Sequence, residues 1–165
     1  MNIQSKEWIE NSKGSVHLLL VGQSKGHIIK ILEMFEPIHI ELFTSSELLQ
    51  DVSEFVGSIS SYEGTYHISV IPSFTENSVF SGISIIYSRY KIIKSRFPRI
   101  KIYFGITGGT NTMAVEMGLT AVMTEEPIHY VVRDLSRQNA SENVMLFNTE
   151  ELRKIIKNGM INGGL

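Results

Sequence analysis

The sequence of 165 residues contains no cysteine. A disulfide framework, a thiolate metal site and a cysteine nucleophile are therefore excluded. No apolar run reaches the roughly 18 residues that a membrane-spanning helix requires. The first 15 residues also lack the apolar stretch of a secretory signal. We therefore expect a cytoplasmic protein with no membrane partner.

The sequence also has no large excess of positive or negative charge. Fifteen lysines and arginines are balanced by 17 aspartates and glutamates, which gives a net charge of −2. A protein that clamps a long nucleic acid needs many cations to neutralise its phosphates, so we expect no long nucleic acid as a partner. A short anionic ligand, held by a few local groups, remains compatible with this balance.

Strand-like and helix-like segments alternate from residue 16 onward. The apolar run Val16–Gly22 is typical of a strand buried on both faces. Further strands are expected at 38–43, 66–71, 100–106, 128–132 and 144–147, and helices at 28–35, 44–59, 79–97, 113–121 and 149–158. This alternation predicts an α/β fold: a three-layer, Rossmann-like domain over residues 16–165, with a mostly parallel central sheet of about six strands flanked by helices. Residues 1–15 form an amino-terminal segment that packs either on this domain or across a dimer seam.

Polar loops follow the strands at the edge of the sheet where a ligand is expected. Ligands of such sheets bind at the carboxyl ends of the strands, where the strand order reverses. In the usual Rossmann order, the loop containing Ser24 then faces the turn Thr107–Asn111 across one crevice. Hydroxyls, helix N-termini and glycines favour a ligand that carries phosphate. Turn geometry explains the same residue types, and a capping box with Glu47 explains Thr44.

Several familiar motifs are missing. The loop after the first strand is not GxGxxG, and neither GxxxxGK[ST] nor GxSxG occurs. The histidines lack metal-ligand spacing, so we expect no metal and no cofactor. We expect structural roles for those within strands, His17, His39, His67 and His129. For His27, at a helix start, we expect either a hydrogen bond to a phosphate or solvation.

The fourth strand and its turn resemble a known motif. Residues 102–114, IYFGITGGTNTMA, are similar to the strand–TGGT–helix motif of CARF domains, the CRISPR-associated Rossmann-fold sensors. Residues 16–24, VHLLLVGQS, resemble the first strand and serine-containing loop of that family, and the strand ending at Thr44 resembles its second strand. The resemblance extends over residues 16–158 in matching order.

The resemblance implies a homodimer whose two crevices join into one pocket for a cyclic oligoadenylate. This messenger is made by type III CRISPR complexes, and we expect cyclic tetra-adenylate as the ring. A two-fold site suits a ring with an even number of adenylates. The implied phosphate contacts come from Ser24, Lys25 and the turn, and the implied ribose or adenine contacts from Thr44, Thr75 and Asn77. The full predicted ligand-binding set is Gln23, Ser24, Lys25, Thr44, Thr75, Asn77, Thr107, Gly108, Gly109, Thr110 and Asn111.

Cleavage of the ring is a second implication. Only residues 149–165 follow the last strand, so we expect a stand-alone protein without a nuclease or DNA-binding module. Some stand-alone CARF proteins are metal-independent ring nucleases, in which the ribose 2′-hydroxyl attacks its own phosphodiester and leaves a 2′,3′-cyclic phosphate. The expected catalytic residues are Ser24, Lys25 and Asn111, although Asn111 stands where many relatives carry lysine and so brings no charge.

Three interpretations therefore remain open. The protein is a ring nuclease, a non-catalytic sensor that acts through a separate partner, or an unrelated Rossmann-type enzyme for a nucleotide or sugar phosphate.

Overall fold

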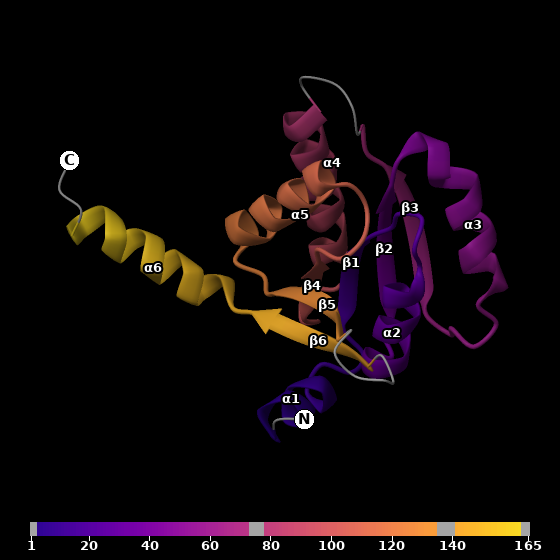
Figure 1. The fold of residues 1–165 in the computed structure, drawn as a ribbon, viewed down its shortest axis with the longest axis horizontal. Coiled ribbons are helices and arrows are strands. Elements are labelled where there is room, and N and C mark those ends of the chain that lie inside the picture. The colour runs from indigo at the N-terminus through magenta and orange to yellow at the C-terminus, as the bar shows by residue number, and fades with distance from the viewer. Residues whose placement is uncertain (1–2, 73–77, 135–140, 163–165) are drawn as a thin grey trace.

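A six-stranded sheet in the order β3-β2-β1-β4-β5-β6 forms the centre of the protein (Figure 1). This computed structural model describes residues 3–72, 78–134 and 141–162. The strands are β1 (Val16–Leu20), β2 (His39–Thr44), β3 (Thr65–Val70), β4 (Ile102–Gly105), β5 (Ile128–Asp134) and β6 (Ser141–Phe147). The first five are parallel, and β6 pairs antiparallel with β5. The predicted, mostly parallel sheet is confirmed.

Helices cover both faces of this sheet. The helices of the described residues are α1 (Ile3–Glu10), α2 (Gly26–Phe35), α3 (Leu49–Ser58), α4 (Ser78–Arg96), α5 (Asn111–Thr124) and α6 (Thr149–Asn162), with a short 3-10 helix, η1 (Ser46–Leu48), before α3. Figure 1 shows α2 and α3 on one side of the sheet, α4 and α5 on the other, and α6 projecting away from both. The predicted three layers are therefore confirmed. Among the helices of the described ranges, none combines the length and apolar content needed to cross a bilayer.

Strand β1 lies at the middle of both cores. Its alternate side chains Leu18 and Leu20 pack with residues of α4 and α5, whereas Leu19 and Val21 pack with residues of α2 and α3. All five residues of β1 are buried, because a strand with helices on both faces has no polar side. This two-sided burial is what the apolar run in the sequence predicts.

The amino-terminal segment packs on the body of the domain. The Trp8 ring lies 5.2 Å from that of Phe35 and 6.0 Å from that of Tyr103, centroid to centroid. The Ser12 hydroxyl also hydrogen-bonds the Tyr103 hydroxyl at 2.6 Å. Helix α1 therefore adds to the α2 side of the core.

Two buried histidines link β1 to β5 across the intervening strand β4. The imidazoles of His17 and His129 share a hydrogen bond of 3.0 Å, and His17 also bonds the Ser15 hydroxyl at 2.8 Å. Burial lowers the pKa of His129 to about 3 and that of His17 well below its ordinary value, so both rings are neutral at physiological pH. Their surroundings fit the structural role expected for histidines within strands.

A buried carboxylate ties the sheet to α4. Glu41 of β2 accepts two hydrogen bonds from the Arg89 guanidinium, at 2.7 and 3.0 Å, and one from His67 at 2.7 Å. Burial raises the pKa of this carboxyl, but hydrogen bonds from His39 and Arg89 more than offset burial and hold it below the ordinary value. The paired charge is thus retained inside the protein.

One expected local feature is wrong. The Thr44 hydroxyl donates to the Val21 carbonyl oxygen at 3.0 Å instead of capping a helix with Glu47. The turn of η1 intervenes, and α3 begins only at Leu49. The hydroxyl is satisfied by the neighbouring strand, a partner that the local spacing of the sequence does not reveal.

A second buried carboxyl has no such partner. Glu116 of α5 lies against Gly82 of α4, where a Cβ would collide with the carboxyl group. Neither Glu116 oxygen accepts a hydrogen bond among the described residues. Burial raises the pKa of Glu116 to about 7.

Glu116 should make stability depend on pH. Its pKa in the folded protein lies above the unfolded value of 4.5, so its contribution is fully present below about pH 4.5 and is lost as pH rises through about 7. We expect the free energy of unfolding to fall by about 2–3 kcal/mol across this window relative to Glu116→Gln. Urea titrations at pH 5 and pH 8 measure the difference. The control is Glu54→Gln on the exposed face of α3, and equal pH slopes for wild type and Glu116→Gln would contradict the prediction.

Candidate ligand-binding crevice

The loop after β1 touches the turn after β4. Strands β1 and β4 are paired neighbours, and a Cβ on Gly22 would lie 2.9 Å from the Gly109 backbone nitrogen. This is closer than real Cβ atoms approach a backbone, so glycine is required for the two loops to meet. The prediction that the loops after the first and fourth strands face each other is confirmed.

The TGGT turn has a conformation that its glycines permit. Gly108 and Gly109 have φ values of +91° and +66°, in the left-handed region that other residues rarely adopt. The Thr107 hydroxyl accepts the Val131 backbone N–H at 2.7 Å, which ties the turn to β5. The Thr110 hydroxyl accepts the Met113 N–H at 3.2 Å and so caps α5. Both threonines thus shape the turn through their side chains.

The imidazole of His27 packs against this turn. It is buried, and its Nε2–H donates to the Leu20 carbonyl oxygen at 2.8 Å. A Cβ on Gly108 would lie 2.7 Å from the imidazole ring. The expectation that His27 donates to a phosphate or is solvated is wrong, because the ring lies beneath the loop that was expected to bind the ligand.

A crevice of about 510 Å³ opens where these loops meet. Its apolar walls come from Val21, Leu48 and Met113. Of the predicted residues, Gln23, Gly109 and Thr110 line it. The remaining lining residues are Gly22, Ser45 and Glu47. The crevice therefore lies at the carboxyl ends of β1, β2 and β4, where ligands of such sheets bind.

The three predicted catalytic residues lie at helix starts near this crevice. Ser24 is exposed just before α2, and Asn111 is exposed as the first residue of α5. Lys25 instead forms an ion pair with Asp51 of α3, and its ammonium lies 5.9 Å from the centre of the Phe55 ring. Its charge is therefore directed at α3 rather than into the crevice.

The other predicted ligand contacts do not line the crevice where the structure describes them; they are Ser24, Lys25, Thr44, Thr107, Gly108 and Asn111. Thr44 is fully buried, and its hydroxyl is already donated to β1. Thr75 and Asn77 lie outside the described residues.

Glu47 is the charged lining residue that the sequence interpretation did not include among the ligand contacts. It had been assigned to a helix cap, yet it lies in η1 and lines the crevice. The available signal was its place after the second strand, where Rossmann domains carry an acidic residue that binds a ribose.

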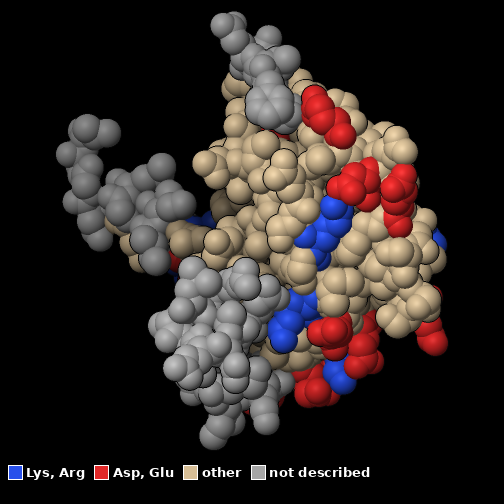
Figure 2. All heavy atoms as spheres, turned by 45° about the vertical axis from the view of Figure 1, so that its right-hand side comes forward, with Lys and Arg blue, Asp and Glu red and all other residues tan. Residues whose placement is uncertain are grey.

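Charge around the α2–α3 side of the protein is mixed. Figure 2 shows acidic and basic side chains interspersed among uncharged ones, without an extended basic patch on the described part of this face. Within the described ranges, no three His, Asp or Glu side chains are grouped so that they could hold a metal ion. The groups in and around the crevice that could hold an anion are therefore hydroxyls, amides and helix N-termini.

A larger cavity of about 730 Å³ lies at the opposite edge of the sheet. Its lining includes Leu32, Ile38 and Tyr62, near the amino ends of β2 and β3. Helices α2 to α5 begin at the other edge, and no residue that lines the cavity stands at a helix start, so the cavity lacks the helix N-termini that suit an anion. The smaller crevice is the better candidate site.

The comparisons with known proteins point to one group of structures. No family model and no curated protein matches the sequence. Csm6 of Enterococcus italicus, bound to cyclic hexa-2′-fluoro-hexa-dAMP, matches with a TM-score of 0.67 and 16% identity, over 91% of this chain and 47% of that chain. Can2 from Sulfobacillus thermosulfidooxidans, in complex with cyclic tetra-adenylate, gives 0.58 and 16%, over 78% and 36%. A type III CRISPR defence DNA nuclease activated by cyclic oligoadenylate gives 0.61 and 15%, over 81% and 20%.

The chain has the fold of these three structures. The resemblance to CARF domains, drawn from the TGGT turn and the first strand, is thereby confirmed at the level of the fold. The chain spans less than half the length of each of these three proteins.

The contact between Gly22 and Gly109 can be tested by substitution. Gly22→Ala should lower the free energy of unfolding by about 1–3 kcal/mol, because the added methyl group meets a backbone nitrogen that cannot move aside alone. The matched control is Gly57→Ala on α3, where a Cβ meets nothing within 4 Å and alanine should stabilise the helix by roughly 0.5–1 kcal/mol. Urea denaturation measures both, and equal effects at the two positions would contradict the close approach.

Proposed function

We propose that this protein is a CARF-type protein of type III CRISPR defence that binds a cyclic oligoadenylate in the crevice between β1 and β4. The observation that carries the proposal is the contact of the TGGT turn with the loop after β1, at the edge of the sheet where α2 and α5 begin. Structures with the same fold hold cyclic hexa-2′-fluoro-hexa-dAMP and cyclic tetra-adenylate, which supports this choice of anion.

The helix starts near the crevice suit phosphate. Helix α2 has 10 residues and α5 has 14, and neither has an acidic residue in its first turn. The N–H groups at a helix start and the positive end of the helix dipole favour a bound anion. The exposed hydroxyl of Ser24 and amide of Asn111 add two neutral donors at these same starts.

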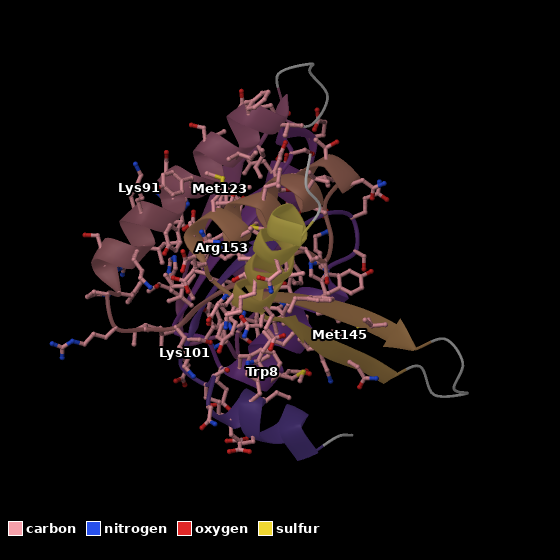
Figure 3. All side chains as sticks on the ribbon, turned by 90° about the vertical axis from the view of Figure 1, so that its left-hand side faces the viewer. Trp8, Lys91, Lys101, Met123, Met145 and Arg153 are labelled. Carbon is pink, nitrogen blue, oxygen red and sulfur yellow. The ribbon has the colours of Figure 1, made fainter. Side chains whose placement is uncertain are left out.

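An unpartnered apolar face on α5 supports a homodimer. Val115, Leu119 and Met123 recur every four residues along the helix and are 54%, 46% and 60% exposed. Figure 3 shows Met123 on the side of the molecule from which α6 projects, together with Met145 of β6. Because α5 begins at the crevice, a two-fold contact along this face would bring the crevices of two copies towards each other.

The charge of the crevice favours binding over rapid cleavage. Among the described lining residues there is no lysine or arginine, and the nearby Lys25 is paired with Asp51. Charge that develops on the phosphate oxygens would be stabilised only by neutral donors. We therefore place a binding protein first, acting through a separate partner.

A ring nuclease is the second candidate, because Ser24 and Asn111 are exposed donors at the two helix starts. In that reaction the ribose 2′-oxygen forms a bond to phosphorus and the bond from phosphorus to the 5′-oxygen breaks. The 2′-hydroxyl proton is lost to solvent, the 5′-oxygen gains one, and the products are a 2′,3′-cyclic phosphate and a 5′-hydroxyl. The chain would contribute position and hydrogen bonds.

Binding and cleavage are separated by one assay with pure protein, labelled cyclic tetra-adenylate and EDTA. We expect one ring per two protomers by calorimetry, and roughly tenfold weaker binding for Ser24→Ala and Asn111→Ala, since each removes a donor to a charged group. Ser53→Ala, on the exposed side of α3, is the control. Recovery of the intact ring identifies a sensor, and linear products ending in a cyclic phosphate identify a nuclease. Affinity for a mononucleotide or sugar phosphate without affinity for the ring would refute the proposal.

The dimer face is tested by placing a charge in it. Leu119→Glu should convert the dimer to a monomer in sedimentation velocity, because a carboxylate in a buried apolar contact is strongly unfavourable. Tyr66→Glu, at a residue of similar exposure (49%) on the edge strand β3, should leave the dimer intact. A wild-type protein that stays monomeric with the ring bound would contradict this contact.

A further inference from the structure

One carboxylate lines a crevice that otherwise suits an anion. Glu47 is the only charged residue among the nine described residues that line it. A carboxylate only accepts hydrogen bonds, and it repels phosphate. A part of the ligand that contacts Glu47 directly is therefore expected to carry a hydrogen-bond donor.

Glu47 is ionised at neutral pH. Its own backbone N–H and the Ser45 hydroxyl hold the pKa of its carboxyl below the ordinary value. Its side chain is exposed rather than committed to the core. A carboxylate has about four acceptor positions, so Glu47 can accept a further hydrogen bond from a ligand beside these local ones.

A cyclic oligoadenylate offers two kinds of donor, the ribose 2′-hydroxyl and the exocyclic amine of adenine. The 2′-hydroxyl belongs to the sugar that carries the phosphate, whereas the amine lies at the far edge of the base. Glu47 shares a crevice of about 510 Å³ with Gly109 and Thr110, at the start of α5 where a phosphate would bind. The ribose 2′-hydroxyl, which lies close to the phosphate, is therefore the donor that suits the position of Glu47.

The place of Glu47 in the fold gives an independent argument. It follows β2, the strand next to β1, about two dozen residues after the loop that touches the TGGT turn. In dinucleotide-binding Rossmann domains, an acidic residue at this place accepts a hydrogen bond from a ribose 2′-hydroxyl. Glu47 has a comparable place here, three residues after the end of β2, although the phosphate-binding loops differ.

We propose that Glu47 accepts a hydrogen bond from a ribose 2′-hydroxyl of the bound ring and so selects RNA over DNA. This inference rests on the proposed function and deepens it, because it names the group that distinguishes the messenger from its deoxy counterpart.

The test compares cyclic tetra-adenylate with its all-2′-deoxy analogue by calorimetry. Wild-type protein should prefer the ribose ring by roughly tenfold or more, the usual effect of one hydrogen bond to a charged group. Glu47→Ala should reduce this ratio to near one, mainly by weakening the ribose ring. Glu54→Ala, an exposed glutamate on α3 that does not line the crevice, should keep the wild-type ratio. Urea titrations establish that both variants are folded.

Each other outcome has a distinct meaning. An unchanged ratio in Glu47→Ala overturns the inference and leaves the proposed function intact, as does a gain in affinity for both rings alike. A ring of inosine, which lacks the amine, gives a further arm: if Glu47→Ala removes only the preference for adenine over inosine, the carboxylate reads the base and the inference is wrong. Binding of neither ring by wild-type protein refutes the proposed function itself.

Discussion

The close approach of Gly22 to Gly109 determines where the loops after β1 and β4 meet and where the crevice between them lies. It follows from the position of β1, which is fully buried, pairs with β2 and β4, and contacts helices on both faces. Because these contacts hold β1 in register, the loop at the carboxyl end of β1 meets the loop at the carboxyl end of β4. The crevice is thus a consequence of core packing, and glycine at both contact points is the local condition for it.

Charged groups are distributed differently in the interior and at the crevice. Inside, the Glu41 carboxylate is retained because Arg89 and His67 satisfy it. Near the crevice, Lys25 is neutralised by Asp51, which leaves hydroxyls, amides and helix N-termini as the groups that can receive phosphate. Such a site suits a short anion with a few fixed phosphates better than a long polyanion, in agreement with the near-neutral charge of the whole chain.

The sequence predicted those features that depend on periodicity and on turn chemistry. The apolar run at Val16, the alternation of elements and the TGGT turn were sufficient for the layers of the fold and for the meeting of two loops. Partners contributed by distant segments could not be predicted: Asp51 lies 26 residues from Lys25, and Thr44 bonds a carbonyl of the neighbouring strand. Glu47 was overlooked because a capping box is an adequate local explanation for a glutamate three residues after a threonine.

The position of His27 has a kinetic consequence. Its imidazole, hydrogen-bonded to the Leu20 carbonyl, fills the space under Gly108 while the two turn glycines already have their left-handed conformation. A loop supported in this way would lose little conformational entropy on binding a ligand. For the proposed ligand, association would then be governed by diffusion and orientation rather than by loop rearrangement, and differences in affinity among related rings should arise from how quickly each one dissociates.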